Sequence, residues 1–282
     1  MTTPWELIKK YGLRPRKGLG QSFLIDPNII GKIVNAADIG KDDRVIEIGA
    51  GLGVMTARIA ERAQSVVAID VDPVMIGILR SELMEFPNLT VLEADVLTCD
   101  FASFLDGMVG TPSTVKVLGN IPYNISSQIL FHLLSSRRVI SSMVLMFQKE
   151  VADRITASPG GRDYGILSVL TARYARSWKM MAVPPHCFYP KPRVDSAVLK
   201  FEILDKPRGD VADDELFTTV VRTAFARRRK TLLNNLRTAS FLDRTGLDPG
   251  ELLASLGIDG RRRGETLTVE EFVAITRAVS EK

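Results

Sequence analysis

The chain has 282 residues, enough for one substantial hydrophobic core and a small second unit. Hydrophobic residues make up 45% of the sequence and charged residues 25%, which excludes a chain that is mainly disordered. Lys and Arg exceed Asp and Glu by 37 to 33 and the isoelectric point is near 9.1, so the charge is compatible with a polyanionic partner.

The N-terminal segment, residues 1–20, is basic and lacks the apolar core of a signal peptide. No apolar run along the chain reaches the roughly 18 to 20 residues that a membrane span requires. We therefore expect a cytoplasmic protein without a membrane segment. Further basic clusters at residues 227–230 and 261–263 suit phosphate contacts on folded RNA, with a solvated helix face as the alternative for each.

Apolar runs at residues 43–51, 65–70, 89–95 and 113–120 alternate with segments of helical period. Strands that read as continuous Val, Ile and Leu runs between helices are typical of a parallel sheet covered on both faces. The pattern predicts a doubly wound α/β fold. Two more apolar runs, at 141–148 and 197–204, are expected to form an antiparallel edge of the sheet.

After a polar stretch at 206–215, only helical patterns follow. The amphipathic pieces cover 214–236, 249–257 and 268–280, and the last opens with Thr268 and Glu271 at capping-box spacing. We therefore predict a catalytic domain over residues 1–205 and a small helical domain over 206–282.

A glycine-rich turn follows the first long strand, with Gly49, Gly51 and Gly53 in place of the dehydrogenase pattern G-x-G-x-x-G. Glu47 precedes the turn, and its charge would disfavour a pyrophosphate but complement a cation. S-adenosylmethionine carries an ammonium and a sulfonium, so it is the expected ligand, with Glu47 acting through water or the surrounding backbone. A tight turn without a ligand is the alternative.

Asp70 and Asp95 end the two following strands. Parallel strands end at the same sheet edge, so these carboxylates are expected side by side, Asp70 at the ribose hydroxyls and Asp95, with its neighbour Val96, at the adenine. A helix N-cap is the alternative for either Asp alone.

The next strand ends in Asn120-Ile121-Pro122-Tyr123, a pattern of methyltransferases that modify ring-conjugated amines. The Asn120 oxygen and the Ile121 carbonyl can accept the two N–H groups of an adenine amine and direct its lone pair at a methyl group. Pro122 stiffens the loop, and Tyr123 offers a stacking face. Phe188 is a candidate for the opposite face of a flipped base, with core packing as the alternative.

No metal site is expected, because His132 and His186 are the only histidines. Cys99 and Cys187 lie far apart and are expected to be reduced structural thiols.

Together these motifs make the chain similar to the KsgA/Dim1/Erm family of rRNA adenine N6-methyltransferases, and within it to the small-subunit dimethyltransferases of the KsgA/RsmA type. The resemblance runs nearly end to end. The matching segments are residues 20–24, 47–53, 120–123, 148–151, 164–165, 192–196 and 225–232.

The resemblance implies a Rossmann-like methyltransferase that dimethylates two adjacent adenosines in the 3′-terminal hairpin loop of 16S rRNA, within an immature 30S particle, and so serves ribosome biogenesis. A monomer is expected, with the helical tail binding RNA or the ribosome. By matching position, Tyr123 and Phe188 hold the base, and the cofactor is contacted by Gln21, Ser22, Leu24, Gly49, Asp70, Asp95 and Asn120. Two departures are Ser22, where the family usually has Asn, and Asp70, often Glu.

Three alternatives stay open. An Erm-type enzyme would share the catalytic loop but modify 23S rRNA. An RNA-binding assembly scaffold would have lost catalysis. A NAD-dependent dehydrogenase is disfavoured by the glycine spacing and by Glu47.

Overall fold

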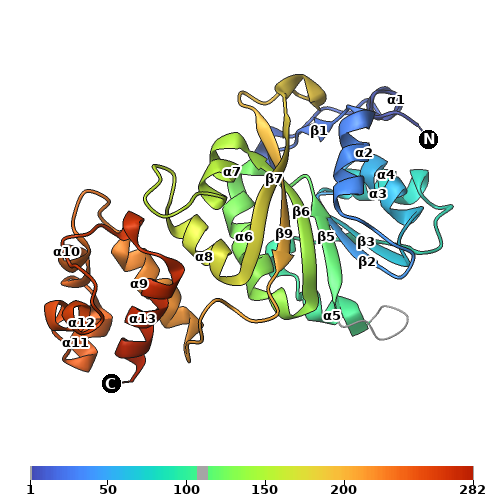
Figure 1. The fold of residues 1–282 in the computed structure, drawn as a ribbon. Coiled ribbons are helices and arrows are strands. Elements are labelled where there is room, and N and C mark those ends of the chain that lie inside the picture. Colours follow the sequence, from blue (N-terminus) through green and yellow to red (C-terminus); the bar gives the residue numbers. More distant parts are fainter. Residues whose placement is uncertain (1, 107–113, 282) are drawn as a thin grey trace. The chain divides into compact units, whose positions relative to one another are not determined.

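The computed structural model describes residues 2–106 and 114–281, which divide into two compact units (Figure 1). Unit 1 comprises Met1–Ala152 and Trp178–Ile203, and unit 2 comprises Asp153–Ser177 and Leu204–Lys282.

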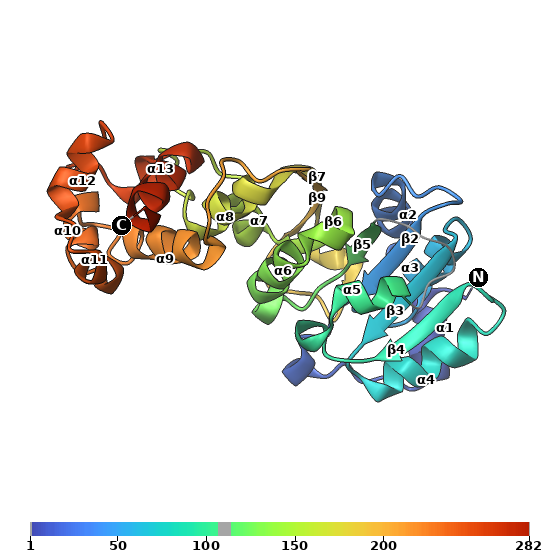
Figure 2. The same ribbon diagram turned by 90° about the horizontal axis from the view of Figure 1, so that it is seen from below.

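Unit 1 is built around a seven-stranded sheet of order β4-β3-β2-β5-β6-β9-β7, with helices on both faces (Figures 1 and 2). Neighbouring strands from β4 to β6 are parallel, and β9 runs antiparallel to β6. The strands are β2 (Arg44–Ile48), β3 (Ser65–Asp70), β4 (Leu89–Glu93), β5 (Val115–Gly119), β6 (Ile140–Gln148), β7 (Ala175–Val183) and β9 (Ser196–Ile203). The doubly wound α/β prediction is confirmed.

The helices of unit 1 begin where the sequence supplies caps. Asp26 accepts backbone N–H bonds at the start of α2 (Pro27–Ala36), and Asp72 does so at the start of α4 (Pro73–Glu82); each helix opens with a proline. The others are α1 (Pro4–Lys10), α3 (Val54–Ala60), α5 (Phe101–Asp106) and α6 (Ser126–Ser135). Strand β2 is buried along its whole length, as expected for a strand covered on both faces.

The edge strand of the sheet differs from the expected one. The antiparallel pair β6 and β9 forms as predicted, but β7 lies outside β9 and is the edge. Strand β7 escaped prediction because polar residues such as Arg176 and Lys179 interrupt its apolar pattern. Exposed edge strands tolerate such residues, since only one side of them is paired.

A second, two-stranded sheet pairs segments far apart in the sequence. Strand β1 (Phe23–Leu24) runs antiparallel to β8 (Phe188–Tyr189), with Phe23 opposite Tyr189 and Leu24 opposite Phe188. This pairing fixes the N-terminal segment beside the chain that leads into β9.

Unit 2 is helical. It holds α8 (Ile166–Tyr174), α9 (Asp214–Ala224), α10 (Leu232–Leu236), α11 (Ser240–Thr245), α12 (Pro249–Ser255) and α13 (Val269–Ser280), and the unit boundary falls within α7 (Lys149–Ile155). The expected helical piece over 214–236 is two helices, because residues 227–230 offer no apolar side chain to continue the buried stripe. The predicted Thr268–Glu271 capping box is present.

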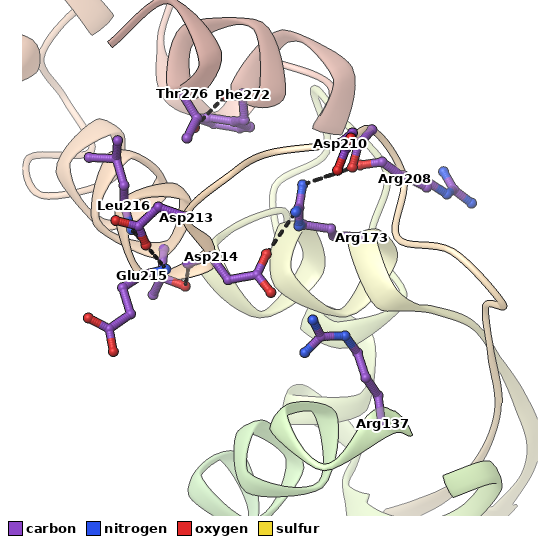
Figure 3. A network of polar contacts seen from close by, with 12 residues as sticks. Arg137, Arg173, Arg208, Asp210, Asp213, Asp214, Glu215, Leu216, Phe272 and Thr276 are labelled. Carbon is purple, nitrogen blue, oxygen red and sulfur yellow. Dashed lines mark hydrogen bonds and ion pairs between the residues drawn. The ribbon is translucent and has the colours of Figure 1, made fainter. Parts of the chain in front are cut away.

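The sequence-based division placed residues 153–177 in the first domain, whereas the structure groups them with the tail. Arg173 of α8 shows the reason (Figure 3). Its side chain is 1% exposed, donates to the carbonyls of Arg208 and Gly209 at 3.3 and 3.4 Å, and pairs with Asp214 at 2.8 Å. A buried guanidinium whose Nη1 and Nη2 donate to the tail ties α8 to it, a contact that local sequence cannot reveal.

Candidate active site

A cavity of about 240 Å³ opens at the carboxyl ends of the parallel strands, where the strand order reverses between β2 and β5. Ligands of open α/β sheets bind at such a point. Most residues singled out from the sequence line this cavity: Gln21, Ser22, Gly49, Gly51, Asp70, Asp95, Val96, Asn120, Ile121, Pro122 and Tyr123.

The glycine turn between β2 and α3 requires glycine for two reasons. Gly49 and Gly51 have φ of 70° and 52°, a region that side chains disfavour. A Cβ on Gly49 would lie 3.1 Å from the carbonyl oxygen of Asn120. The turn and the Asn120 loop are therefore held backbone to backbone at the cavity wall.

Asp70 is positioned by the backbone around it. One carboxylate oxygen accepts from Gly51 N at 2.8 Å and the other from Asp72 N at 2.9 Å. Burial raises the pKa of the Asp70 carboxyl, and these backbone donors oppose that shift. Each carboxylate oxygen has a second lone pair, which leaves capacity for the hydroxyls of a ribose.

Asp95 is exposed at the rim, and its side chain caps the 3₁₀ turn Val96–Thr98 by accepting from Leu97 N at 3.0 Å. The N-cap interpretation and a position at the cavity therefore both hold for this residue.

The side chain of Asn120 is oriented by a single hydrogen bond. Its Nδ2 donates to the carbonyl of Ser22 at 2.9 Å, so the amide is fixed with Oδ1 as its remaining acceptor. Tyr123 is held by a hydrogen bond of 2.6 Å between its hydroxyl and that of Ser196, and burial raises the pKa of its phenol. The oriented amide oxygen can accept a hydrogen bond from the amine of an adenine, and the oriented aromatic ring can stack on its base.

A family model described as "Ribosomal RNA adenine dimethylase" matches residues 12–275. The chain belongs to this family. It is 43% identical to "Ribosomal RNA small subunit methyltransferase A" of Syntrophus aciditrophicus, covering 99% of each chain. It is 45% identical to the protein of that name from Moorella thermoacetica, covering 97% of this chain and 95% of the relative.

Among the solved structures that match, two cover about nine-tenths of the chain. A dimethyladenosine transferase from Plasmodium falciparum gives a TM-score of 0.75 at 28% identity, covering 89% of this chain and 94% of the other. The 23S rRNA methyltransferase ErmE gives 0.67 at 26% identity, covering 92% and 99%. The predicted family and the Rossmann-like methyltransferase fold are confirmed, and S-adenosylmethionine is the cofactor of this enzyme family.

The cavity residues fit that cofactor. Glu47 is fully buried beneath the glycine turn and borders a smaller space of about 50 Å³, together with Gly49, Gly51 and Asn120. Burial, with the charge of Asp70 adding, raises the pKa of Glu47 from 4.5 to about 8. The nearby Thr56 hydroxyl moderates the shift but is not in hydrogen-bonding geometry, so neither Glu47 oxygen has a partner in the described part of the chain. An unpaired buried carboxyl group beside the cavity suits a cationic ligand, because a nearby cation favours its ionised form.

Gln21 lies at the cavity, but both ends of its amide are engaged by protein. Its Nε2 donates to Asp72 at 2.7 Å, and its Oε1 accepts from Arg16 N at 2.8 Å. Asp72, 1% exposed, also pairs with the Arg16 guanidinium at 3.1 Å. Gln21 thus connects residues 16–22 to Asp72 at the start of α4, and this connection shapes the cavity wall. Sequence reasoning missed Asp72, although its place before Pro73 marks it as an N-cap.

Two expected residues lie elsewhere. Phe188 is 1% exposed and belongs to the hydrophobic core, so the core-packing alternative describes its position in this structure. Leu24 borders the smaller space beside Glu47. Alternation along β8 explains the first case: Phe188 packs into one core cluster, and Tyr189, on the other face, is partly buried against a second cluster.

Other cavity residues were not predicted. Val71 is 48% exposed and follows Asp70 directly, a place where an apolar side chain can cover a ligand ring. Gly20 also lines the cavity, and its φ is 65°. Among the described residues no group of three or more His, Cys, Asp or Glu could hold a metal ion. No helix in the same set is long and apolar enough to cross a membrane.

Proposed function

We propose that the chain transfers two methyl groups from S-adenosylmethionine to N6 of each of two adjacent adenosines in the 3′-terminal hairpin loop of 16S rRNA. The substrate is an immature 30S particle, which makes the enzyme a participant in ribosome biogenesis. The observation that carries the proposal is the meeting of the glycine turn, Asp70, Asp95 and the fixed Asn120 amide in one cavity. The names of the relatives support the small-subunit substrate.

In this proposal the cofactor supplies the methyl group, and the chain binds and orients it. Gly49 and Gly51 let the backbone approach without a Cβ in the way. Asp70 accepts from the ribose hydroxyls, and Asp95, with Val96, contacts the adenine of the cofactor. Glu47, at the smaller space beside the cavity, complements the positive charge of the cofactor.

The target adenine amine is a poor nucleophile because its lone pair is delocalised into the ring. In the first transfer, Asn120 Oδ1 and the Ile121 carbonyl would accept hydrogen bonds from its two N–H groups and so orient the lone pair for attack on the methyl group. The Asn120 amide loses no further conformational entropy when it binds the amine, because its hydrogen bond to Ser22 already orients it. Tyr123 stacks on the base, and the product loses its proton to water without a strong general base.

The RNA-binding role of residues 206–282 rests on charge. Arg229 and Lys230 are exposed and have no side-chain partner within the described ranges. Arg228, by contrast, pairs with Glu265 at 3.0 Å, and Arg262 pairs with Glu271. Arg227 is likewise exposed without a side-chain partner in the described ranges, so Arg227, Arg229 and Lys230 are the cations of the 227–230 cluster that we assign to phosphate. We further propose a cytoplasmic monomer.

Mapping of modified adenosines tests the proposal. Small-subunit particles from cells that lack this gene should carry two adjacent unmethylated adenosines near the 3′ end of 16S rRNA. The purified protein and S-adenosylmethionine should restore four methyl groups there. Transfer of labelled methyl groups to 23S rRNA instead would favour the Erm-type alternative, which the structural similarity to ErmE supports. Particle binding without label transfer would favour the assembly scaffold.

A further inference from the structure

An aromatic pair lies at the surface of unit 1, with Trp5 exposed and Tyr189 partly buried against a hydrophobic cluster. Trp5 of α1 is 44% exposed, and its ring centroid is 5.0 Å from that of Tyr189, with the planes tilted by 53°. Helix α1 is anchored through buried Pro4, Leu7 and Ile8. Trp5 is thus not the residue that anchors this helix, and nearly half of its surface stays in solvent.

The pair is tied to the catalytic cavity through Ser22. Tyr189 lies opposite Phe23 in the β1–β8 sheet, and Phe23 lines the cavity. The Ser22 hydroxyl donates to the carbonyl of Pro190 at 3.0 Å, while the Ser22 carbonyl accepts from Asn120 at 2.9 Å. One residue therefore links the backbone next to Tyr189 with the side chain assigned to the target amine.

Three exposed cations lie close to Trp5 or Tyr189 along the chain. Lys9 lies four residues after Trp5 in α1, which places both on one helix face. Lys191 and Arg193 closely follow Tyr189. All three are exposed, and none has a side-chain partner among the residues that the structure describes. Cations beside an exposed aromatic surface match a nucleotide, which has a phosphate and a stacking base.

We infer that Trp5 and Tyr189 form a stacking site for an unpaired RNA base that flanks the target adenosine. The inference rests on the proposed function, because it supplies a contact for the same RNA outside the methyl-transfer cavity. Proteins read unpaired RNA loops by stacking their bases on aromatic side chains. The site takes a single-stranded nucleotide, with Lys9, Lys191 and Arg193 at its phosphates.

Substitution of Trp5 tests stacking against packing. Trp5→Leu keeps an apolar side chain, and Trp5→Phe keeps an aromatic one. On undermethylated 30S particles, Trp5→Leu should raise KM for particles on the order of tenfold, the scale of one lost stacking contact. Trp5→Phe should stay near the wild type, and KM for S-adenosylmethionine and kcat should not change in either. The matched control is Met84→Ala, since Met84 is 84% exposed and outside the cavity lining.

Fluorescence gives a direct reading of the same contact. The chain has 2 tryptophans, so Trp178→Phe leaves Trp5 as the only one. An adenine-rich RNA hairpin loop, added at concentrations where filter binding shows a complex, should quench its emission. Unchanged emission in that complex, or an unchanged particle KM in folded Trp5→Leu, would overturn the inference. Failure of the wild type to methylate the particles would instead refute the proposed function.

Discussion

The protonation of Glu47 gives a prediction whose magnitude follows from the structure. Its carboxyl is fully buried with no hydrogen-bond partner among the described residues, and burial raises its pKa from 4.5 to about 8. Between these values the folded protein holds one proton more than the unfolded chain, so stability falls as pH rises. The shift of about 3.5 units corresponds to about 5 kcal/mol in total, of which about 3 kcal/mol is lost by pH 7.

Glu47→Gln removes the titration while keeping the shape of the side chain. Its amide hydrogens add a desolvation cost that does not vary with pH, so the diagnostic quantity is the slope and not the offset. Urea unfolding of the cofactor-free protein between pH 5 and 8 should show a free energy of unfolding that falls by about 1 kcal/mol per pH unit relative to the variant. The control is Glu61→Gln, an exposed glutamate that should keep the wild-type slope.

The cofactor should reverse the shift. A cation bound above Glu47 favours its charged form, so cofactor binding at pH 7 should release about one proton. Calorimetry in buffers of different ionisation enthalpy measures that number, and Glu47→Gln should release none. Parallel pH slopes for the wild type and Glu47→Gln would refute the reasoning, because Glu47 would then be charged in the folded protein.

Three further predictions concern the cavity wall and unit 2. Asn120→Ala should lower kcat by about 100-fold or more, because the oriented acceptor is lost, while calorimetric affinity for the cofactor stays within several-fold; near-normal kcat would disprove its assigned role. Asp72→Asn keeps a cap for α4 but loses the charge that Arg16 and Gln21 share. It should raise KM for the cofactor several-fold at unchanged kcat and speed proteolysis within residues 16–22, and equal proteolysis rates would contradict the connection of these residues to Asp72. Arg173→Met should destabilise unit 2 by about 2–3 kcal/mol in urea, because two carbonyls and Asp214 lose their donor; an unchanged unfolding midpoint would show that these contacts contribute nothing.

The sequence predicted those parts of the site that depend on chain-local rules. Apolar runs between helices predict parallel strands, and residues that follow such strands must meet at one edge. Gly49, Asp70, Asp95 and Asn120 needed nothing more to be placed in one cavity. The family came from a resemblance that runs nearly end to end and includes segments outside the cavity, such as residues 192–196 and 225–232.

Only the tertiary structure decided contacts between segments far apart in the chain. Gln21 meets Asp72, Phe188 turns into the core, and Arg173 ties residues 153–177 to the helical tail. Strand β7 likewise exists because β9 pairs with it, although its own pattern is polar. Local periodicity reports which face of an element is apolar, whereas the partner of a polar side chain depends on how distant elements pack.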